Sequence, residues 1–246
     1  MNLYQENNIT IHNRDCIEVM SEIEDKKFDL IIADPPYNIG DDNKRTKVGN
    51  VVMTNKEAWG EWDSFTQRDY DKFIFKVIRE SYRILKKGGS FYMFSAREDN
   101  GYFIRYAMRK GFKYKNTLAI LKQNPLPSFR MNNWRSAFEL CMYLTKGKPK
   151  TFNFLSQEEC VNVYPYLIGR KETDHPTEKP RGFIERIIQV SSNEGDIVFD
   201  PFLGSGTTMI AAINLGRKFE GCEKSEAYFN EILKRLKYSE SKIKLF

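Results

Sequence analysis

The sequence is poor in the residues that build metal sites and disulfide frameworks. It contains two histidines and four cysteines, and no two cysteines stand in a C-x-x-C pair. Scattered cysteines of this kind are typical of reduced thiols in the cytoplasm. We therefore expect no bound metal and no disulfide at these positions, which are Cys16, Cys141, Cys160 and Cys222.

Long apolar runs are also missing. No stretch approaches the roughly 20 apolar residues that a membrane-spanning helix needs. Residues 1–6 lack the basic-then-apolar pattern of a signal peptide, so we expect a cytoplasmic protein. With 246 residues, of which 41% are hydrophobic, the chain can bury a sizeable core. We expect residues 1–246 to form a single domain.

Two common phosphate-binding motifs are absent from the glycine-rich segment of the second half. The segment begins as a short apolar strand that runs into Gly204-Ser205-Gly206, where glycines permit a tight turn and the close approach of a ligand. Met209 occupies the third position of the Gly-x-Gly-x-x-Gly fingerprint, and no Gly-Lys-Ser/Thr follows, so ATP is a poor ligand for this turn. A second short strand ends in Glu223, where an acid usually holds a pair of ribose hydroxyls.

The first half does contain a distinctive tetrapeptide, Asp34-Pro35-Pro36-Tyr37, directly after the apolar residues 28–33. In an open α/β sheet, ligands bind at the carboxyl ends of the strands. There the Asp34 carboxylate and a backbone carbonyl can accept hydrogen bonds from an exocyclic amino group, Tyr37 offers a face for stacking, and the prolines stiffen the turn. In isolation, an ordinary exit from strand to loop explains the tetrapeptide equally well, since aspartate and proline are common turn residues.

Taken together and in this order, the two motifs resemble those of the β-class DNA amino-methyltransferases, which use S-adenosylmethionine. In that family the catalytic DPPY motif precedes the cofactor motif FxGxG, a circularly permuted order, as residues 34–37 precede residues 202–206 here. Residues 13–16, 85–94 and 175–180 match further motifs of the family. The resemblance therefore covers nearly the whole chain, and the order of the motifs is its most specific part.

The resemblance implies a Rossmann-like α/β fold with a mainly parallel sheet and helices on both faces. Hydrophobic periodicity agrees, because apolar strands alternate with amphipathic helices along the chain. We expect strands at residues 9–13, 28–33, 90–95, 117–122, 139–145, 196–199 and 218–223, the fourth and fifth as a hairpin-like pair at a sheet edge. We expect helices at residues 16–23, 69–85, 100–110, 180–190, 209–213 and 225–237.

The resemblance also implies roles around the glycine turn. Asp15 would bond the adenine amino group of the cofactor beside Cys16, and Glu223 would take the ribose hydroxyls. Asp200 and Lys179 would lie near the methionine end, although a solvated lysine before a proline is an alternative for Lys179. The residues that would wrap the rest of the cofactor are Asp34, Phe202, Gly204, Ser205, Gly206, Thr207 and, on motif position alone, Thr177.

The reaction that the resemblance implies is methylation of the N6 amino group of an adenine in DNA. The amino group is paired inside a duplex, so the base must first be flipped out. Tyr37 would stack on the flipped base, while Asp34 and the Pro35 carbonyl accept the amino hydrogens and Pro36 keeps the turn rigid. Methyl transfer is then a direct in-line displacement without a covalent nucleophile, and positioning is its main catalytic contribution.

Three alternatives stay open. N4-cytosine methylation uses the same fold, but serine commonly replaces the leading aspartate in that group, so Asp34 favours adenine. Methylation of protein glutamine or of RNA is disfavoured, because those enzymes usually carry the glycine-rich motif first and asparagine before Pro-Pro-Tyr. A DNA-binding module that has lost catalysis is disfavoured by the intact Asp34, Tyr37, Gly204, Gly206 and Glu223.

Charge suits a polyanionic partner, because 39 Lys and Arg stand against 33 Asp and Glu and give a formal net charge of +6. We expect double-stranded DNA as partner, with the protein at the nucleoid when bound.

Residues 38–67 fit a mobile DNA-facing flap or, equally, a solvated loop with its tryptophans packed on the core, and residues 123–174 fit a target-recognition insertion. The candidate DNA contacts are Lys44, Arg45, Trp62, Arg130, Asn132, Asn133 and Arg135. A homodimer and a cognate restriction endonuclease are further partners that the resemblance leaves open.

Overall fold

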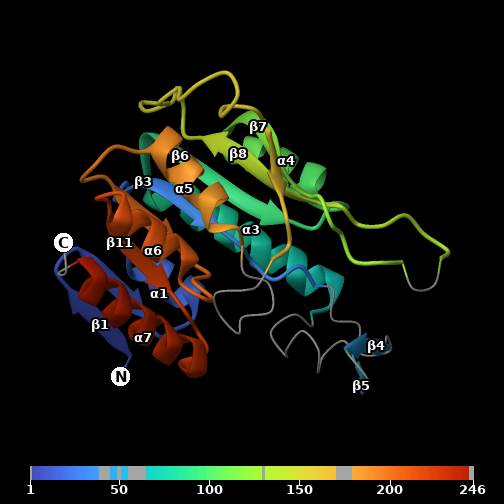
Figure 1. Cartoon of the computed structure of the whole chain (residues 1–246). Helices are drawn as coiled ribbons and strands as arrows, with labels where there is room; N and C mark the ends of the chain where they lie inside the picture. The colour runs from blue at the N-terminus through green and yellow to red at the C-terminus, as the bar shows by residue number, and fades with distance from the viewer. Residues whose placement is uncertain are drawn as a thin grey trace.

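The structure is a computed structural model that describes residues 2–38, 45–48, 51–54, 65–128, 131–169 and 179–243. Within these ranges nine strands form one sheet in the order β1-β2-β11-β10-β3-β6-β8-β7-β9 (Figure 1). From β2 to β6 in this order all neighbouring strands run parallel, which confirms the mainly parallel sheet that we expected. The strands are β1 (Leu3–Glu6), β2 (Ile9–His12), β3 (Phe28–Ala33), β6 (Leu85–Ser95), β7 (Lys113–Lys122), β8 (Phe138–Thr145), β9 (Val163–Tyr166), β10 (Ile197–Asp200) and β11 (Lys218–Cys222).

The other part of the sheet departs from parallel order. β8 runs antiparallel to both β6 and β7, so β7 and β8 form the hairpin-like pair that we expected. This pair does not lie at the edge, because β9, which was not predicted, adds parallel to β7. The other strand that was not predicted, β1, lies at the opposite edge and pairs antiparallel with β2. Both are four residues long and neither contains a fully buried residue, so they lack the buried apolar pattern that marks a core strand.

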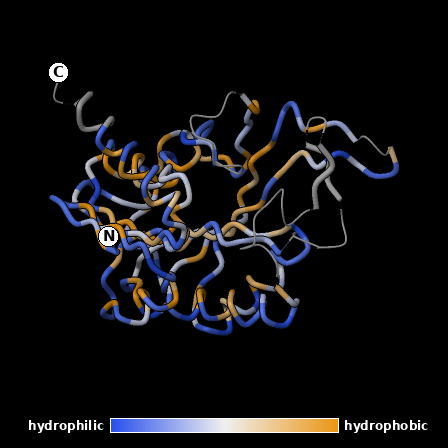
Figure 2. The backbone as a smooth tube through the Cα atoms, turned by 90° about the horizontal axis from the view of Figure 1, so that it is seen from below, coloured by the Kyte–Doolittle hydropathy of each residue, from blue (hydrophilic) through white to orange (hydrophobic). Residues whose placement is uncertain are grey.

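Helices cover both faces of the sheet, as expected, and Figure 2 shows the sheet edge-on between the two layers. On one face Leu30 and Ile32 of β3 pack with the helices of the second half of the chain. On the other face Ile31 and Ala33 pack with the helices of the first half, because successive strand residues point to opposite sides. The helices are α1 (Cys16–Glu22), α3 (Gln67–Ile84) and α4 (Asn100–Arg109) on the latter face, and α5 (Arg181–Ser191), α6 (Thr207–Asn214) and α7 (Glu226–Ile243) on the former.

The expectation of an irregular loop over residues 38–67 is wrong in part. Within it, β4 (Arg45–Val48) and β5 (Val51–Thr54) pair with each other as a separate antiparallel sheet. Their valines favour strands, but runs of four residues are too short for a periodic pattern to show. Residues 39–44, 49–50 and 55–64 lie outside the described part of the chain, so the DNA-facing flap stays a prediction.

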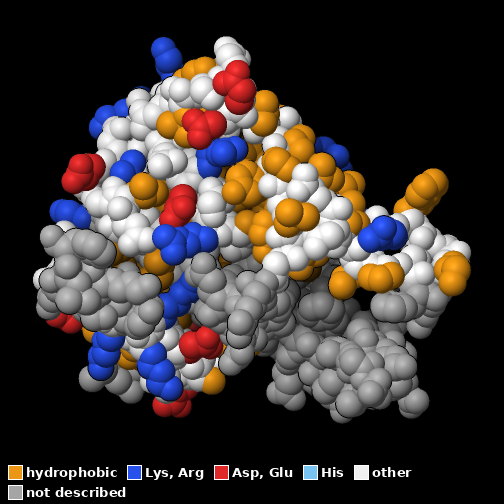
Figure 3. Space-filling model, in the orientation of Figure 1, with side chains coloured by type: hydrophobic (Ala, Val, Ile, Leu, Met, Phe, Trp, Pro, Cys, Tyr) orange, Lys and Arg blue, Asp and Glu red, His pale blue; other side chains and the backbone are white. Residues whose placement is uncertain are grey.

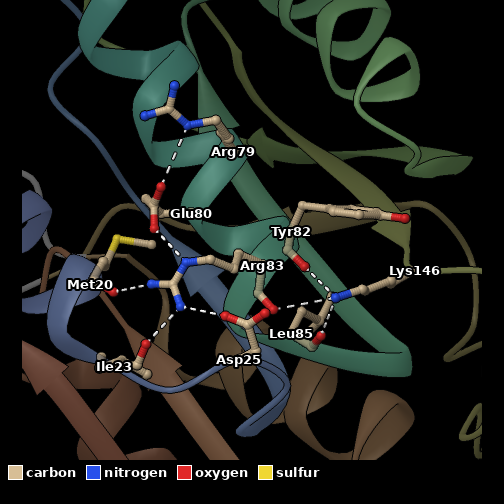
Figure 4. A network of polar contacts seen from close by, with 9 residues as sticks. All are labelled: Met20, Ile23, Asp25, Arg79, Glu80, Tyr82, Arg83, Leu85 and Lys146. Atoms are coloured by element: carbon tan, nitrogen blue, oxygen red, sulfur yellow. Dashed lines mark hydrogen bonds and ion pairs between the residues drawn. The ribbon is translucent and has the colours of Figure 1, made fainter.

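A polar network joins the end of α3 to the end of α1, at the opposite end of the sheet from the loops after β3 (Figure 4). The Arg83 guanidinium donates to the backbone carbonyls of Met20 and Ile23 and to the carboxylates of Asp25 and Glu80. The last carbonyls of a helix have no partner within the helix, so an arginine that binds them satisfies groups that would otherwise be unpaired. Arg83 therefore fixes α1 against α3.

Lys146 likewise donates hydrogen bonds to backbone carbonyls at the end of α3. Its ammonium lies 2.6 Å from the Tyr82 carbonyl oxygen and 2.8 Å from that of Leu85, where α3 ends and β6 begins. A cation at a helix C-terminus is also favoured by the helix dipole. Burial lowers the pKa of Lys146, and the nearby Lys26 adds to this effect.

We expect Arg83→Met to lower the free energy of unfolding by about 2–3 kcal/mol, because hydrogen bonds from a charged donor are lost and carbonyls are left unpaired. Urea unfolding measures this. Arg79→Met, one turn earlier on α3, is the matched control, since that side chain is 55% exposed and makes one long contact of 3.5 Å with Glu80. Equal losses in the two variants would contradict the structural role of Arg83.

Candidate active site

One cavity opens at the carboxyl ends of β2, β11, β10 and β3, and its volume is about 590 Å³. These four strands are parallel neighbours, so the residues that follow them meet at one edge of the sheet. Asp15 follows β2, Glu223 follows β11, Asp200 ends β10 and Asp34 follows β3. The topology thus gathers four acidic residues from distant parts of the chain around one space.

The cavity brings together nearly all the described residues that the sequence predicted for catalysis and cofactor binding. Gly206 is the exception, because it does not line the cavity and instead starts α6 in the left-handed conformation at φ 82°. Thr177 lies outside the described residues. The predicted residues in the lining are Asp15, Cys16, Asp34, Pro35, Pro36, Tyr37, Lys179, Asp200, Phe202, Gly204, Ser205, Thr207 and Glu223. Lining residues that were not predicted are Arg14, Ile32, Phe65, Phe73, Phe94, Ile184, Pro201, Leu203, Thr208, Lys224, Ser225 and Tyr228.

Both carboxylate oxygens of Asp34 have partners. The Tyr37 hydroxyl donates to Oδ1 at 2.8 Å, and Lys179 Nζ lies 2.9 Å from Oδ2. Burial raises the pKa of Tyr37 well above its ordinary value, and the charge of Asp34 adds to this, so the phenol stays a donor. The strand-end aspartate and the aromatic ring of the tetrapeptide therefore form one hydrogen-bonded unit.

Lys179 bridges two carboxylates inside the cavity wall. Its ammonium lies 2.9 Å from Asp34 Oδ2 and 3.2 Å from Glu139 Oε2, and the side chain is only 10% exposed. Burial alone would lower the pKa of Lys179, but the two carboxylates outweigh it and raise the pKa above its ordinary value. The alternative of a solvated lysine is therefore wrong for Lys179.

Glu139 is a member of this cluster that the sequence did not reveal. It sits on β8 and also forms an ion pair of 2.5 Å with Lys122 at the end of β7. Burial would raise the pKa of Glu139, but the adjacent Lys179 and Lys122 lower it below the ordinary value. A glutamate near the start of an apolar strand gives no sign in the sequence that it faces a lysine 40 positions later.

Asp200 is a buried acid in the cavity wall. Its side chain is 3% exposed, and Oδ1 accepts a hydrogen bond of 2.9 Å from the Phe202 backbone N–H. Burial raises the pKa of Asp200 to about 7, although hydrogen bonds from Thr208 and the Phe202 backbone oppose the shift. A cationic ligand in the cavity would restore the charged form.

Glu223 holds the glycine turn in place. One carboxylate oxygen accepts from the Gly204 backbone N–H at 2.8 Å and the other from the Ser225 N–H at 2.7 Å. Burial raises the pKa of Glu223, and these backbone donors counteract the shift. Each carboxylate oxygen can accept a second hydrogen bond, so Glu223 can bind hydroxyls in the cavity while it fixes the turn.

Asp15 and Cys16 form the start of α1. Asp15 is the N-cap, and its Oδ1 accepts from the Ile17 backbone N–H at 2.9 Å while Oδ2 lies 3.2 Å from Lys224 Nζ. Burial raises the pKa of the Cys16 thiol, and the charge of Asp15 adds to it. The thiol is neutral and nearly inaccessible, so it is unsuited to act as a nucleophile.

An arm projects between β7 and β8 (Figure 1), and the structure describes its residues 123–128 and 131–137. Figure 3 shows hydrophobic side chains standing out on this arm, and Trp134 is 95% and Met131 89% exposed. Asn132 and Asn133 are exposed as well, whereas the Arg135 guanidinium donates to the Pro125 and Leu126 carbonyls within the arm. Of the other predicted DNA contacts, Lys44, Trp62, Arg130 and the side chain of Arg45 lie outside the described residues.

Known proteins resemble this chain over most of its length. The profile of the N6_N4_Mtase family, described as DNA methylase, matches residues 28–234. The type II methyltransferase M2.DpnII of Streptococcus pneumoniae is 30% identical over 95% of this chain and 91% of its own length. The crystal structure of an M1.HpyAVI–SAM complex matches with a TM-score of 0.69 and 27% identity, over 92% of this chain and 99% of that one.

A further solved structure bears on the fold alone. The cytosine-N4-specific PvuII DNA methyltransferase matches with a TM-score of 0.73 over 92% of this chain and 85% of that one, at 18% identity.

Among the described residues, no helix is long and apolar enough to cross a membrane. The chain belongs to the DNA methylase family, and its fold is that of the methyltransferases that use S-adenosylmethionine.

Proposed function

We propose that this protein transfers a methyl group from S-adenosylmethionine to the N6 amino group of an adenine flipped out of double-stranded DNA. The observation that carries the proposal is the single cavity that joins the Asp34–Tyr37 unit to the glycine turn and Glu223. Family membership supports the reaction class, since the matching profile is that of DNA methylases. The aspartate that leads the tetrapeptide favours adenine.

The donor set of the cavity fits the cofactor. Glu223 has acceptor capacity for the ribose hydroxyls, and Asp200 offers a buried carboxyl to a cationic methionine end. Asp15, Cys16 and Phe202 line the cavity and would hold the adenine, and the turn around Gly204 would hold the rest of the nucleoside. When bound, S-adenosylmethionine supplies an electrophilic methyl group on its sulfonium.

At the other end of the cavity, Asp34 and Tyr37 act on the target base. Tyr37 turns its hydroxyl away from Asp34 and stacks on the base, worth about 1–3 kcal/mol by analogy with other base–aromatic contacts. Asp34 and the Pro35 carbonyl accept the two amino hydrogens and so aim the nitrogen lone pair at the methyl group. The new nitrogen–carbon bond forms as the carbon–sulfur bond breaks, and Asp34 is placed to accept the proton that the nitrogen then loses.

We assign DNA recognition to two segments. The insertion at residues 123–174, with the arm at its start, reads the target, and the flap at residues 38–67 covers the bound duplex. In the arm, Asn132 and Asn133 are exposed for base edges, and Trp134 presents a free aromatic face. We treat residues 1–246 as one catalytic domain that works on chromosomal DNA in the cytoplasm, alone or as a homodimer, beside a cognate endonuclease.

Expression in a host without its own DNA methylases tests the reaction. Genomic DNA is digested and the modified nucleosides are quantified by mass spectrometry. We expect N6-methyladenine with the natural chain and a loss of at least about 100-fold with Asp34→Ala, because the amino group is no longer oriented. N4-methylcytosine in the digest would overturn the choice of base, and the absence of any methylated base would overturn the proposed function.

The raised pKa of Asp200, about 7, makes cofactor affinity depend on pH. Because the folded-state pKa of Asp200 lies above the ordinary value, the carboxyl stays protonated in the cofactor-free fold up to about pH 7, and stability is lost as the pH rises from the ordinary carboxyl pKa to about 7. A cationic cofactor reverses this, so its dissociation constant should fall between pH 6 and pH 7.5 by up to about tenfold per pH unit and level off above. Isothermal titration measures the profile. The control is Asp200→Asn, for which a slope as steep as that of the natural chain would contradict the assignment.

Trp134→Ala should weaken DNA binding by about tenfold or more, because base–aromatic stacking contributes about 1–3 kcal/mol per base. Fluorescence anisotropy with a labelled duplex at fixed salt measures the affinity. Met108→Ala on α4 is the matched control, since that side chain is also apolar and 51% exposed but lies outside the arm. A similar loss in both variants, or none in either, would count against a DNA contact at Trp134.

A further inference from the structure

The cluster around Lys179 holds charges in alternating sign across four elements of the fold. Lys122 at the end of β7 pairs with Glu139 on β8 at 2.5 Å, and Glu139 pairs with Lys179 at 3.2 Å. Lys179 pairs in turn with Asp34 after β3 at 2.9 Å. Two cations and two carboxylates make the row neutral, which is the condition under which buried charges are tolerated.

In this row, both oxygens of the candidate catalytic carboxylate, that of Asp34, already have partners. Asp34 already receives the Tyr37 hydroxyl on one oxygen and the Lys179 ammonium on the other. A carboxylate held by a buried ammonium is a weaker acceptor for a neutral amino group, because the ammonium is the stronger donor. Withdrawal of Lys179 would therefore strengthen the bond between Asp34 and an incoming amino group.

Glu139 provides the place to which Lys179 can withdraw. The ammonium is already within 3.2 Å of Glu139, so a small displacement shifts it from one carboxylate toward the other while the ammonium itself stays paired. The ammonium also lies 5.2 Å from the centre of the Tyr37 ring and 5.0 Å from that of Phe94, and both rings favour a cation at this place. Asp34 would then exchange its bonds with Lys179 and Tyr37 for a bond to the incoming amino group.

We propose that Glu139 is a positioning residue that shares the Lys179 ammonium with Asp34 and draws it away when the target amino group arrives. The inference rests on the proposed function, since it concerns the acceptance of that amino group by Asp34. Glu139 touches neither base nor cofactor in this scheme. It acts only through Lys179, and Lys122 sets the strength with which Glu139 attracts the ammonium.

The test is the single-turnover rate of methyl transfer from S-adenosylmethionine to an adenine-containing duplex. The dissociation constants of the cofactor and of the duplex are measured alongside it. Glu139→Gln leaves Lys179 on Asp34, so the rate should fall by about 100-fold while the cofactor dissociation constant stays within about twofold. Glu139→Asp keeps the carboxylate and should recover at least about tenfold of the loss. Glu185→Gln on α5 is the matched control, because Glu185 pairs with Arg181 in an exposed contact.

Lys122→Met separates this role from a merely structural one. Without Lys122, Glu139 attracts Lys179 more strongly, so this variant should keep a rate at least about tenfold above that of Glu139→Gln. Equal losses in the two variants, accompanied by equal losses of thermal stability, would show a structural pair and overturn the proposal. So would a Glu139→Gln rate within about twofold of the natural one. Absence of transfer by the natural chain would instead refute the proposed function, so the two failures are distinguishable.

Discussion

The parallel alignment of β2, β11, β10 and β3 is the constraint on which the site depends, because it places Asp15, Glu223, Asp200 and Asp34 at one edge. Asp29 near the start of β3 helps to fix this alignment. Its Oδ2 accepts a hydrogen bond of 3.0 Å from the Ile197 backbone N–H at the start of β10 and lies 2.7 Å from Lys86 Nζ. A slip of one residue between these strands would turn every side chain of β10 to the other face of the sheet. The first and last thirds of the chain therefore share a site through paired strands, and Asp29 adds a bond between the starts of β3 and β10.

Gathering acids at one edge has an electrostatic consequence for the whole molecule. The formal net charge is +6, yet the cavity at the strand ends is lined by four carboxylic acids against three cations, Arg14, Lys179 and Lys224. Lys179 and Lys224 are paired with Asp34 and Asp15, so Asp200 and Glu223 are the acids of the lining that can receive a cationic ligand. The acids of the lining suit a positively charged cofactor, whereas the net positive charge of the chain suits DNA.

Much of the fold follows from local patterns in the sequence. Residues 28–33 are apolar except for Asp29, and β3 has these same bounds. The period of Phe73, Val77 and Ile78 predicts α3, in which Val77 and Ile78 are buried and Phe73 is half-buried. β1 and β9 were not predicted because they are short strands without a fully buried residue, and their pairing depends on β2 and β7. The strand pair β4–β5 was missed for a similar reason, since its runs are four residues long.

The candidate site likewise contains residues that the sequence predicts and one that it does not. Motif order predicts Asp34, Lys179 and Glu223, because each belongs to a stretch with its own pattern in the sequence. Glu139 has no such pattern, and it reaches the ammonium of Lys179 because β8 lies between β6 and β7 in the sheet, where Glu139 is the register partner of Ile120.

The arm is rooted in the same two strands that carry this ion-pair row. Lys122 is the last residue of β7, its backbone N–H bonds the Ala137 carbonyl, and Glu139 follows two residues after the arm ends. The base of the arm and the ion-pair row are therefore one piece of structure, so a shift of these strand ends would move Lys122 and Glu139 together and with them the surroundings of Lys179.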